Sequence, residues 1–143
     1  MPDLTIPAAS VGALLKERQQ TLSVSESFCG GLLSGCLEAI PGASAYYVGG
    51  AVVYTRAAHK RVLQVPDSAM ANMRASTEAY ALLNTRTIRE ALSATWALSE
   101  TGASGPSGRA ITLESGSNDR EANMWAFARA AFDLLEQCVR EAG

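Results

Sequence analysis

The residues from Ser25 to Gly31 combine hydroxyl groups, a carboxylate and a thiol with two glycines, in the order Ser-Glu-Ser-Phe-Cys-Gly-Gly. They follow a β-like run at 21–24 and precede a helix-like run at 32–40. A turn between a strand and a helix presents backbone N–H groups to which an anion or a developing oxyanion can bind. Cys29 and Ser27 lie in this turn and are candidate nucleophiles. A purely structural glycine-rich turn over a buried cysteine would show the same pattern, so both interpretations stay open.

A second glycine-rich turn is predicted at 101–108, where Thr-Gly-Ala-Ser-Gly-Pro-Ser-Gly follows a β-like run. Its candidate binding residues are Gly102, Ser104 and Gly105. In open α/β sheets, ligands bind beyond the carboxyl ends of the strands, so we expect the two turns to border one cleft. The alternative is that 101–108 is a surface connection without a ligand.

The composition is that of a globular chain of 143 residues, with 48% hydrophobic and 18% charged residues. This length predicts one domain over residues 1–143. The formal net charge is −2 and Lys and Arg form no cluster, which argues against nucleic acid or an anionic membrane as a partner. No apolar run approaches the roughly 20 residues of a membrane span, and the N-terminus does not resemble a signal peptide.

The cysteine and histidine content argues against a metal site. Three cysteines form no Cys-x-x-Cys pair, and the chain has one histidine, so zinc ligation is not expected. Cys36 and Cys138 are interpreted as core residues, as are Trp96 and Trp125. Free cysteines without a pairing pattern predict a reducing, cytoplasmic location.

Helix-like and strand-like segments alternate along the chain, which predicts a three-layer α/β/α sandwich of the α/β class. The strand at 45–55 reads as a central one because it is apolar and rich in β-branched residues. A helix at 76–92 would begin with Ser76 or Thr77 as its cap, and the last helix with Asn118-Asp119. The predicted helices are 8–18, 30–40, 59–63, 76–92 and 120–139, and the predicted strands are 21–25, 45–55, 95–99 and 110–114.

Three segments carry motifs in the same order as those of a known family. They are Glu-Ser-Phe-Cys-Gly-Gly at 26–31 followed by Pro-Gly-Ala-Ser at 41–44, Tyr-Thr-Arg-Ala-Ala-His at 54–59, and Gly-Ala-Ser-Gly-Pro-Ser-Gly at 102–108. They resemble the motifs Glu-Ser-Cys-Thr-Gly-Gly, Tyr-Ser-Asn-x-x-Lys and Gly-x-Ala-Gly-Pro-x-Gly of the CinA C-terminal domain family. Members of that family are nicotinamide-nucleotide amidases associated with competence/damage-inducible proteins.

The resemblance implies an amidohydrolase that converts nicotinamide mononucleotide to its acid form and ammonia, without a metal or a cofactor. It implies a small-molecule nucleotide as substrate or ligand and a homo-oligomeric assembly. The apolar residues Met124, Trp125, Phe127 and Phe132 of the last helix, which lie on more than one side, favour an oligomer as well. After Gly108 the chain is shorter than the family pattern, either by a true deletion or because a loop is missing from the sequence.

Two departures from the family motifs coincide. Cys29 stands where the family has threonine, and His59 stands where it has the lysine that resembles a catalytic base. A thiolate stabilised by an imidazolium is a competent nucleophile, so a Cys29–His59 pair is one hypothesis. An inactive relative that binds a nucleotide or acts as an interaction module is the second. Catalysis by another group, such as Ser27, is the third.

The remaining motif residues each have a functional and a structural interpretation. Tyr54 either hydrogen-bonds in the site or packs at a strand end. Glu26 either orients the base or caps a turn, and Arg56 either meets a substrate phosphate or is an exposed arginine. The N–H groups of Gly30 and Gly31 are expected to point at a forming oxyanion beside the sulfur of Cys29.

Overall fold

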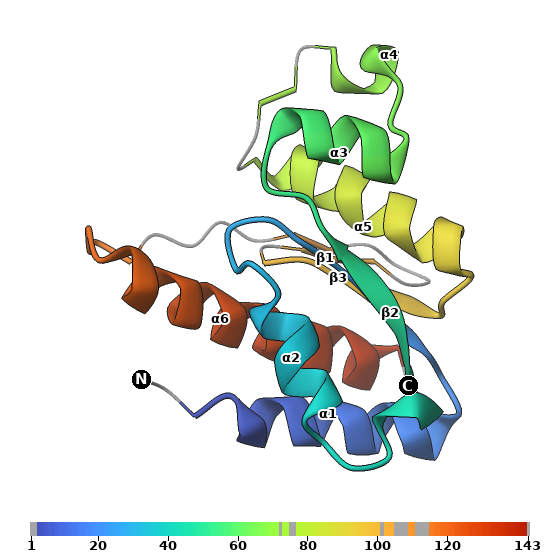
Figure 1. Ribbon diagram of the computed structural model, residues 1–143. Helices are drawn as coiled ribbons and strands as arrows, with labels where there is room; N and C mark the ends of the chain where they lie inside the picture. Colours follow the sequence, from blue (N-terminus) through green and yellow to red (C-terminus); the bar gives the residue numbers. More distant parts are fainter. Residues whose placement is uncertain are drawn as a thin grey trace.

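Figure 1 shows the fold of the chain in a computed structural model. The structure describes residues 3–71, 73–74, 77–100, 102–104, 109–110 and 115–142, with the backbone alone for 102–104. Among these described residues, no helix is both long enough and apolar enough to cross a membrane.

The sheet has five strands in the order β2-β1-β3-β4-β5. The strands β1 (Leu22–Glu26), β2 (Tyr47–Val52) and β3 (Trp96–Leu98) are parallel to one another. The strands β4 (Gly102–Ser104) and β5 (Arg109–Ala110) continue the sheet antiparallel to β3 and to each other. The carboxyl ends of β1, β2 and β3 therefore meet at one edge of the sheet.

Helices cover both faces of the sheet, which gives the predicted three-layer α/β/α sandwich (Figure 1). On one face lie α1 (Thr5–Arg18), α2 (Leu32–Glu38) and α6 (Arg120–Glu141), and on the other α3 (Arg56–Leu63) and α5 (Glu78–Leu92). A 3₁₀ turn (Ala43–Ala45) precedes β2, and a one-turn helix α4 (Asp67–Met70) follows α3.

The capping predictions concern two helices. The side chain of Thr77 accepts a hydrogen bond from the Tyr80 N–H, and the side chain of Asp119 accepts one from the Ala122 N–H. These two caps are confirmed. The alternative cap, Ser76, lies outside the described residues.

Two hydrophobic clusters form the core, one on each face of the sheet. The larger lies under α1, α2 and α6 and includes Trp96 and Phe132, both fully buried. The smaller lies under α3 and α5 and includes Val53, Ile88 and Ala97. Alternate residues of β3 point to opposite clusters, as the period of a strand requires.

Two sequence predictions about the sheet are wrong. The strand at 45–55 is not central, because β2 is an edge strand whose alternate residues Val48 and Val52 are about half exposed. Residues 102–104 do not form a turn but the strand β4, which pairs with β3 and so covers an edge that would otherwise be open. Of the strand predicted at 110–114, the structure describes Ala110 in β5, and 111–114 lie outside the described residues.

Candidate functional site

The turn between β1 and α2 lies at the carboxyl edge of the parallel strands, as the sequence predicts. Gly30 and Gly31 take positive φ angles of 64° and 101°, which side chains with a Cβ rarely adopt. The Gly30 N–H donates to the carbonyl oxygen of Ser27 at 3.2 Å, which closes the turn. This donor is therefore engaged within the turn and does not point at a forming oxyanion.

Glu26 caps helix α2. Its side chain is fully buried, and its two carboxylate oxygens accept hydrogen bonds from the N–H groups of Leu33 at 2.7 Å and Ser34 at 3.0 Å. A carboxylate at this place satisfies donors that the first turn of a helix leaves open and interacts favourably with the helix dipole. Of the two interpretations of Glu26, the structure supports the cap.

Glu100, which follows β3, occupies further donors of the same turn. One of its carboxylate oxygens, Oε1, accepts hydrogen bonds from the N–H groups of both Ser27 and Cys29, the latter at 2.9 Å. Burial raises the pKa of Glu100, and the two N–H donors oppose that rise. The carboxylate of Glu100 thus occupies N–H groups of the turn to which the sequence predicts that an external anion binds.

The thiol of Cys29 lies in the larger core cluster, where the residue is 1% exposed. Its sulfur donates to the carbonyl oxygen of Met124 on α6 at 3.4 Å. Burial, and then the nearby carboxylates of Glu100 and Glu26, raise the pKa of this thiol far above its ordinary value. A thiol that does not ionise near neutral pH is a packing group rather than a nucleophile.

His59 lies in the helical layer formed by α3 and α5, with 1% of its surface exposed. Its Nε2 donates to Oδ1 of Asn84 at 2.5 Å, and its ring stacks on that of Tyr80 with centroids 4.9 Å apart. The hydrogen bonds of His59 and Cys29 thus lead to α5 and α6, on opposite faces of the sheet. The hydrogen bond expected between Cys29 and His59 is absent from the described residues. Each side chain is instead bonded to a helix on its own face of the sheet, Cys29 to α6 and His59 to α5.

Of the four predicted catalytic residues, solvent reaches Ser27 and Tyr54. Ser27 is partly exposed, whereas Tyr54, which follows β2, is 61% exposed. The Tyr54 hydroxyl accepts a hydrogen bond from Nη2 of Arg120 at 3.0 Å. Arg56, the first residue of α3, is exposed, and among the described residues it forms no ion pair.

The glycine-rich segment at 102–108 contributes less to the described site. Gly102 and Ser104 belong to the backbone of β4, and Gly105 lies outside the described residues. Within the described ranges, His, Cys, Asp and Glu side chains form no group of three that could hold a metal ion.

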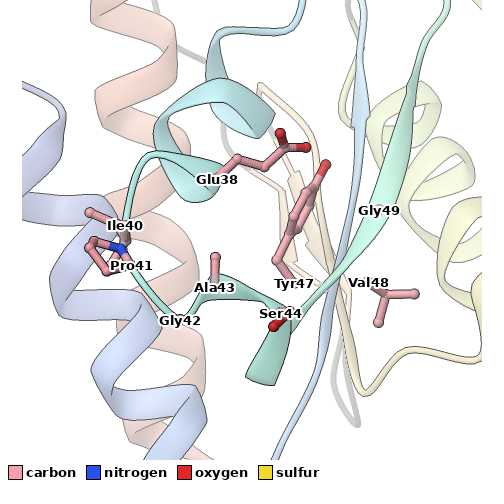
Figure 2. Close-up of a pocket in the computed structure, with 9 residues that line it drawn as sticks. All are labelled: Glu38, Ile40, Pro41, Gly42, Ala43, Ser44, Tyr47, Val48 and Gly49. Atoms are coloured by element: carbon pink, nitrogen blue, oxygen red, sulfur yellow. The ribbon is translucent and has the colours of Figure 1, made fainter.

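A pocket of about 470 Å³ opens at the other end of β2 (Figure 2). It lies between the connection from α2 to β2 and the start of β2, and the side chains of Glu38 and Tyr47 lie close together beside it. None of the predicted site residues lines it. Its lining residues are Glu38, Ile40, Pro41, Gly42, Ala43, Ser44, Tyr47, Val48 and Gly49.

The sequence did not predict two residues that lie at the carboxyl ends of the parallel strands, Glu100 and Arg120. A signal for Glu100 existed, since a carboxylate two residues after β3 is expected to lie near the turn that follows its parallel neighbour β1. For Arg120 there was no such signal. It begins a helix more than sixty residues beyond Tyr54, and only the packing of α6 across the sheet brings the two together.

Comparison with known proteins identifies the family. The model of the CinA C-terminal domain matches residues 5–139. A CinA-like protein of Cyanothece is 42% identical over 101 residues, which cover 71% of this chain and 24% of that protein. A CinA-like protein of Salinibacter ruber is 39% identical over 106 residues, 74% of this chain and 26% of that protein. The chain thus matches about a quarter of the length of these relatives.

Solved structures share the fold. A CinA superfamily protein of Klebsiella pneumoniae superposes with a TM-score of 0.85 at 21% identity, over 98% of this chain and 99% of that one. A competence/damage-inducible protein of Agrobacterium tumefaciens superposes with a TM-score of 0.84 at 21% identity, over 98% and 97% of the two chains. With the match of the family model along nearly the whole sequence, these similarities place the chain in the CinA C-terminal domain family.

Proposed function

We propose that this domain binds a small pyridine nucleotide at the carboxyl edge of its sheet and does not hydrolyse amides through Cys29 and His59. The second half of this proposal, that Cys29 and His59 do not catalyse hydrolysis, rests on the burial of Cys29, whose thiol donates a hydrogen bond to the Met124 carbonyl oxygen. Family membership and two exposed arginines support the first half: Arg120 donates a hydrogen bond to Tyr54, and Arg56 follows Tyr54 by two residues in the chain.

Two arginines at this edge suit an anionic ligand. Guanidinium groups bind phosphate through charge-assisted hydrogen bonds, and Tyr54 adds an exposed aromatic ring and a hydroxyl. The donors of the β1–α2 turn contribute less, because Glu100 already occupies those of Ser27 and Cys29. A ligand would therefore lie outside the turn, over the surface formed by Tyr54 and the two arginines.

Calorimetric titration of nicotinamide mononucleotide into the protein tests binding. We expect a saturable heat that persists in Cys29→Ala, because the thiol faces the core. Ammonia measured in the same samples should stay at the level of the buffer. The absence of any binding to nicotinamide mononucleotide would contradict the first half of the proposal, and ammonia release that requires Cys29 would contradict the second.

A second candidate is amide hydrolysis in which Ser27 is the nucleophile. Ser27 stands at the serine of the family motif and is partly exposed, in contrast to Cys29. Ammonia release by the wild-type protein that is lost in Ser27→Ala and retained in Cys29→Ala would establish this activity. Release unaffected by Ser27→Ala would exclude it.

A further inference from the structure

Arg120 is held in place by aromatic groups from two other elements. Its Nη2 donates to the Tyr54 hydroxyl at 3.0 Å, and its Cζ lies 5.0 Å from the centroid of the Phe28 ring. The Phe28 ring packs against that of Phe127, with centroids 5.4 Å apart. A cation–π contact with an aromatic ring and a hydrogen bond to a hydroxyl both restrict a guanidinium group without neutralising its charge.

The charge of Arg120 is not paired within the described part of the chain. The other arginines of α6, Arg129 and Arg140, form ion pairs with Asp133 and Glu136. Asp119, which precedes Arg120, uses its carboxylate to cap α6 through the Ala122 N–H. Arg120 therefore differs from the other described arginines of its helix, because it is held in place and yet forms no ion pair with a described carboxylate.

The position of Arg120 is beyond the carboxyl ends of β1 and β2. Phe28 belongs to the turn after β1, and Tyr54 follows β2. Ligands of parallel α/β sheets bind at this edge. Since the Tyr54 oxygen accepts the Arg120 hydrogen bond, the Tyr54 proton is available for an oxygen of a ligand.

We infer that Arg120 and Tyr54 form the subsite for the phosphate group of a mononucleotide. The inference rests on the proposed function and deepens it. The free N–H groups of Arg120 donate to two phosphate oxygens, the Tyr54 hydroxyl donates to one of them, and the Phe28 ring holds the guanidinium group in place through its cation–π contact. The arginine of this subsite comes from α6, outside the three motifs of the sequence.

Binding measurements with matched ligands test the subsite. Nicotinamide mononucleotide and nicotinamide riboside differ by the phosphate alone, and each is titrated calorimetrically into the wild-type protein and Arg120→Gln. We expect Arg120→Gln to weaken binding of the mononucleotide by about 10- to 100-fold, the range of a charge-assisted hydrogen bond. Binding of the riboside should not change.

Two further variants sharpen the test. Tyr54→Phe should weaken binding of the mononucleotide by a smaller factor, about 2- to 10-fold. Arg129→Gln removes an arginine of the same helix that is paired with Asp133 and should leave binding unchanged. An equal loss for both ligands in Arg120→Gln, or no loss for the mononucleotide, would overturn the subsite while the proposed function stands.

A titration with inorganic phosphate separates the two proposals when the wild-type protein binds no nucleotide. The Nε–H resonance of Arg120 is followed by NMR and assigned by its absence in Arg120→Gln. A saturable shift of this resonance would support an anion subsite and contradict the nucleotide function. No shift, together with no nucleotide binding, would overturn both.

Discussion

At the scale of single residues, the environment of Cys29 decides the chemistry of the β1–α2 turn. The thiol is buried, bound to the Met124 carbonyl, and has a raised pKa. Cys36, on α2, is half-buried and only packs against the core. A motif that places a thiol beside N–H donors therefore does not suffice for a nucleophile, because the direction of the side chain depends on the elements that pack on it.

We predict that Cys29 resists alkylation in the folded protein. With iodoacetamide at pH 8, peptide mass spectrometry should find Cys36 modified first and Cys29 unmodified until the protein is unfolded in urea, because the thiolate is the reactive form. Labelling of native Cys29 as fast as that of Cys36 would contradict its burial.

The raised pKa of Glu100 predicts a pH dependence of stability. Its ordinary value is 4.5, and in the folded protein the carboxyl holds its proton to higher pH than in the unfolded chain. The contribution of Glu100 to the free energy of unfolding therefore falls as pH rises from about 4.5 through the folded pKa, by about 1.4 kcal/mol for each unit of difference.

Comparison with Glu100→Gln isolates this contribution, because glutamine keeps an acceptor oxygen for the turn but does not titrate. Urea unfolding between pH 4 and 8 should show the wild-type protein losing stability relative to Glu100→Gln as pH rises. A difference that stays constant, or that changes in favour of the wild type, would show that burial does not dominate at this carboxylate.

Individual residues were predictable from the sequence where the cause is local. Glu26 lies seven and eight positions before the two N–H groups that it caps, so its capping role was one of the two open interpretations. The burial of Cys29 depends on Met124, and the position of Arg120 depends on Tyr54. Both contacts join residues far apart in the sequence, and the pattern of one segment cannot reveal them.

At the scale of elements, the pairing of β1 with β2 depends on Gly50. A Cβ atom at Gly50 would lie 2.2 Å from the carbonyl oxygen of Val24, a backbone atom that cannot move without shifting the strand. The two strands are adjacent in the sheet, and Tyr54 lies two residues beyond the end of β2. Close packing at Gly50 thus helps to place one side of the proposed subsite.

We predict that Gly50→Ala lowers the free energy of unfolding by about 1–3 kcal/mol, as overpacking does. Gly35→Ala is a matched control, since a Cβ there meets nothing within 4 Å and alanine favours the helix by roughly 0.5–1 kcal/mol. Chemical unfolding measures both changes. Equal stability of Gly50→Ala and the wild type would show that the strands separate more easily than their packing indicates.

The elements themselves follow closely from hydrophobic periodicity. The helices α1, α5 and α6 and the strands β1 and β3 occur where the pattern predicts them. The position of a strand in the order of the sheet does not follow from this periodicity. Apolar composition suggested a central β2, but β2 lies at the end of the strand order. Residues 102–104 form the strand β4, which pairs with β3, and no pattern within this short segment predicts that pairing.

At the scale of the whole molecule, we predict that the protein is a homo-oligomer. The apolar residues of α6 that favoured it are largely used within the fold, since Phe132 is buried and Trp125 and Phe127 pack against the core. Exposed apolar side chains remain elsewhere, at Ile6, Val48, Val52 and Val62. Light scattering at micromolar concentration measures the mass, and a monomer would contradict the prediction.

The whole fold also separates the proposed nucleotide-binding surface from the predicted thiol–imidazole pair. The three-layer sandwich separates Cys29 and His59, since one is held by α6 and the other by α5, yet it leaves Tyr54 and Arg120 exposed at the same sheet edge. The proposed binding surface therefore does not depend on a Cys29–His59 pair.

The most direct test is an ammonia-release assay with nicotinamide mononucleotide on the wild-type protein and Cys29→Ala, under conditions in which calorimetry shows the ligand bound. Circular dichroism verifies that the variant is folded. We predict bound ligand in both proteins and no ammonia that depends on Cys29. Ammonia released by the wild type and abolished in folded Cys29→Ala would show that the thiol is a nucleophile and contradict the proposed function.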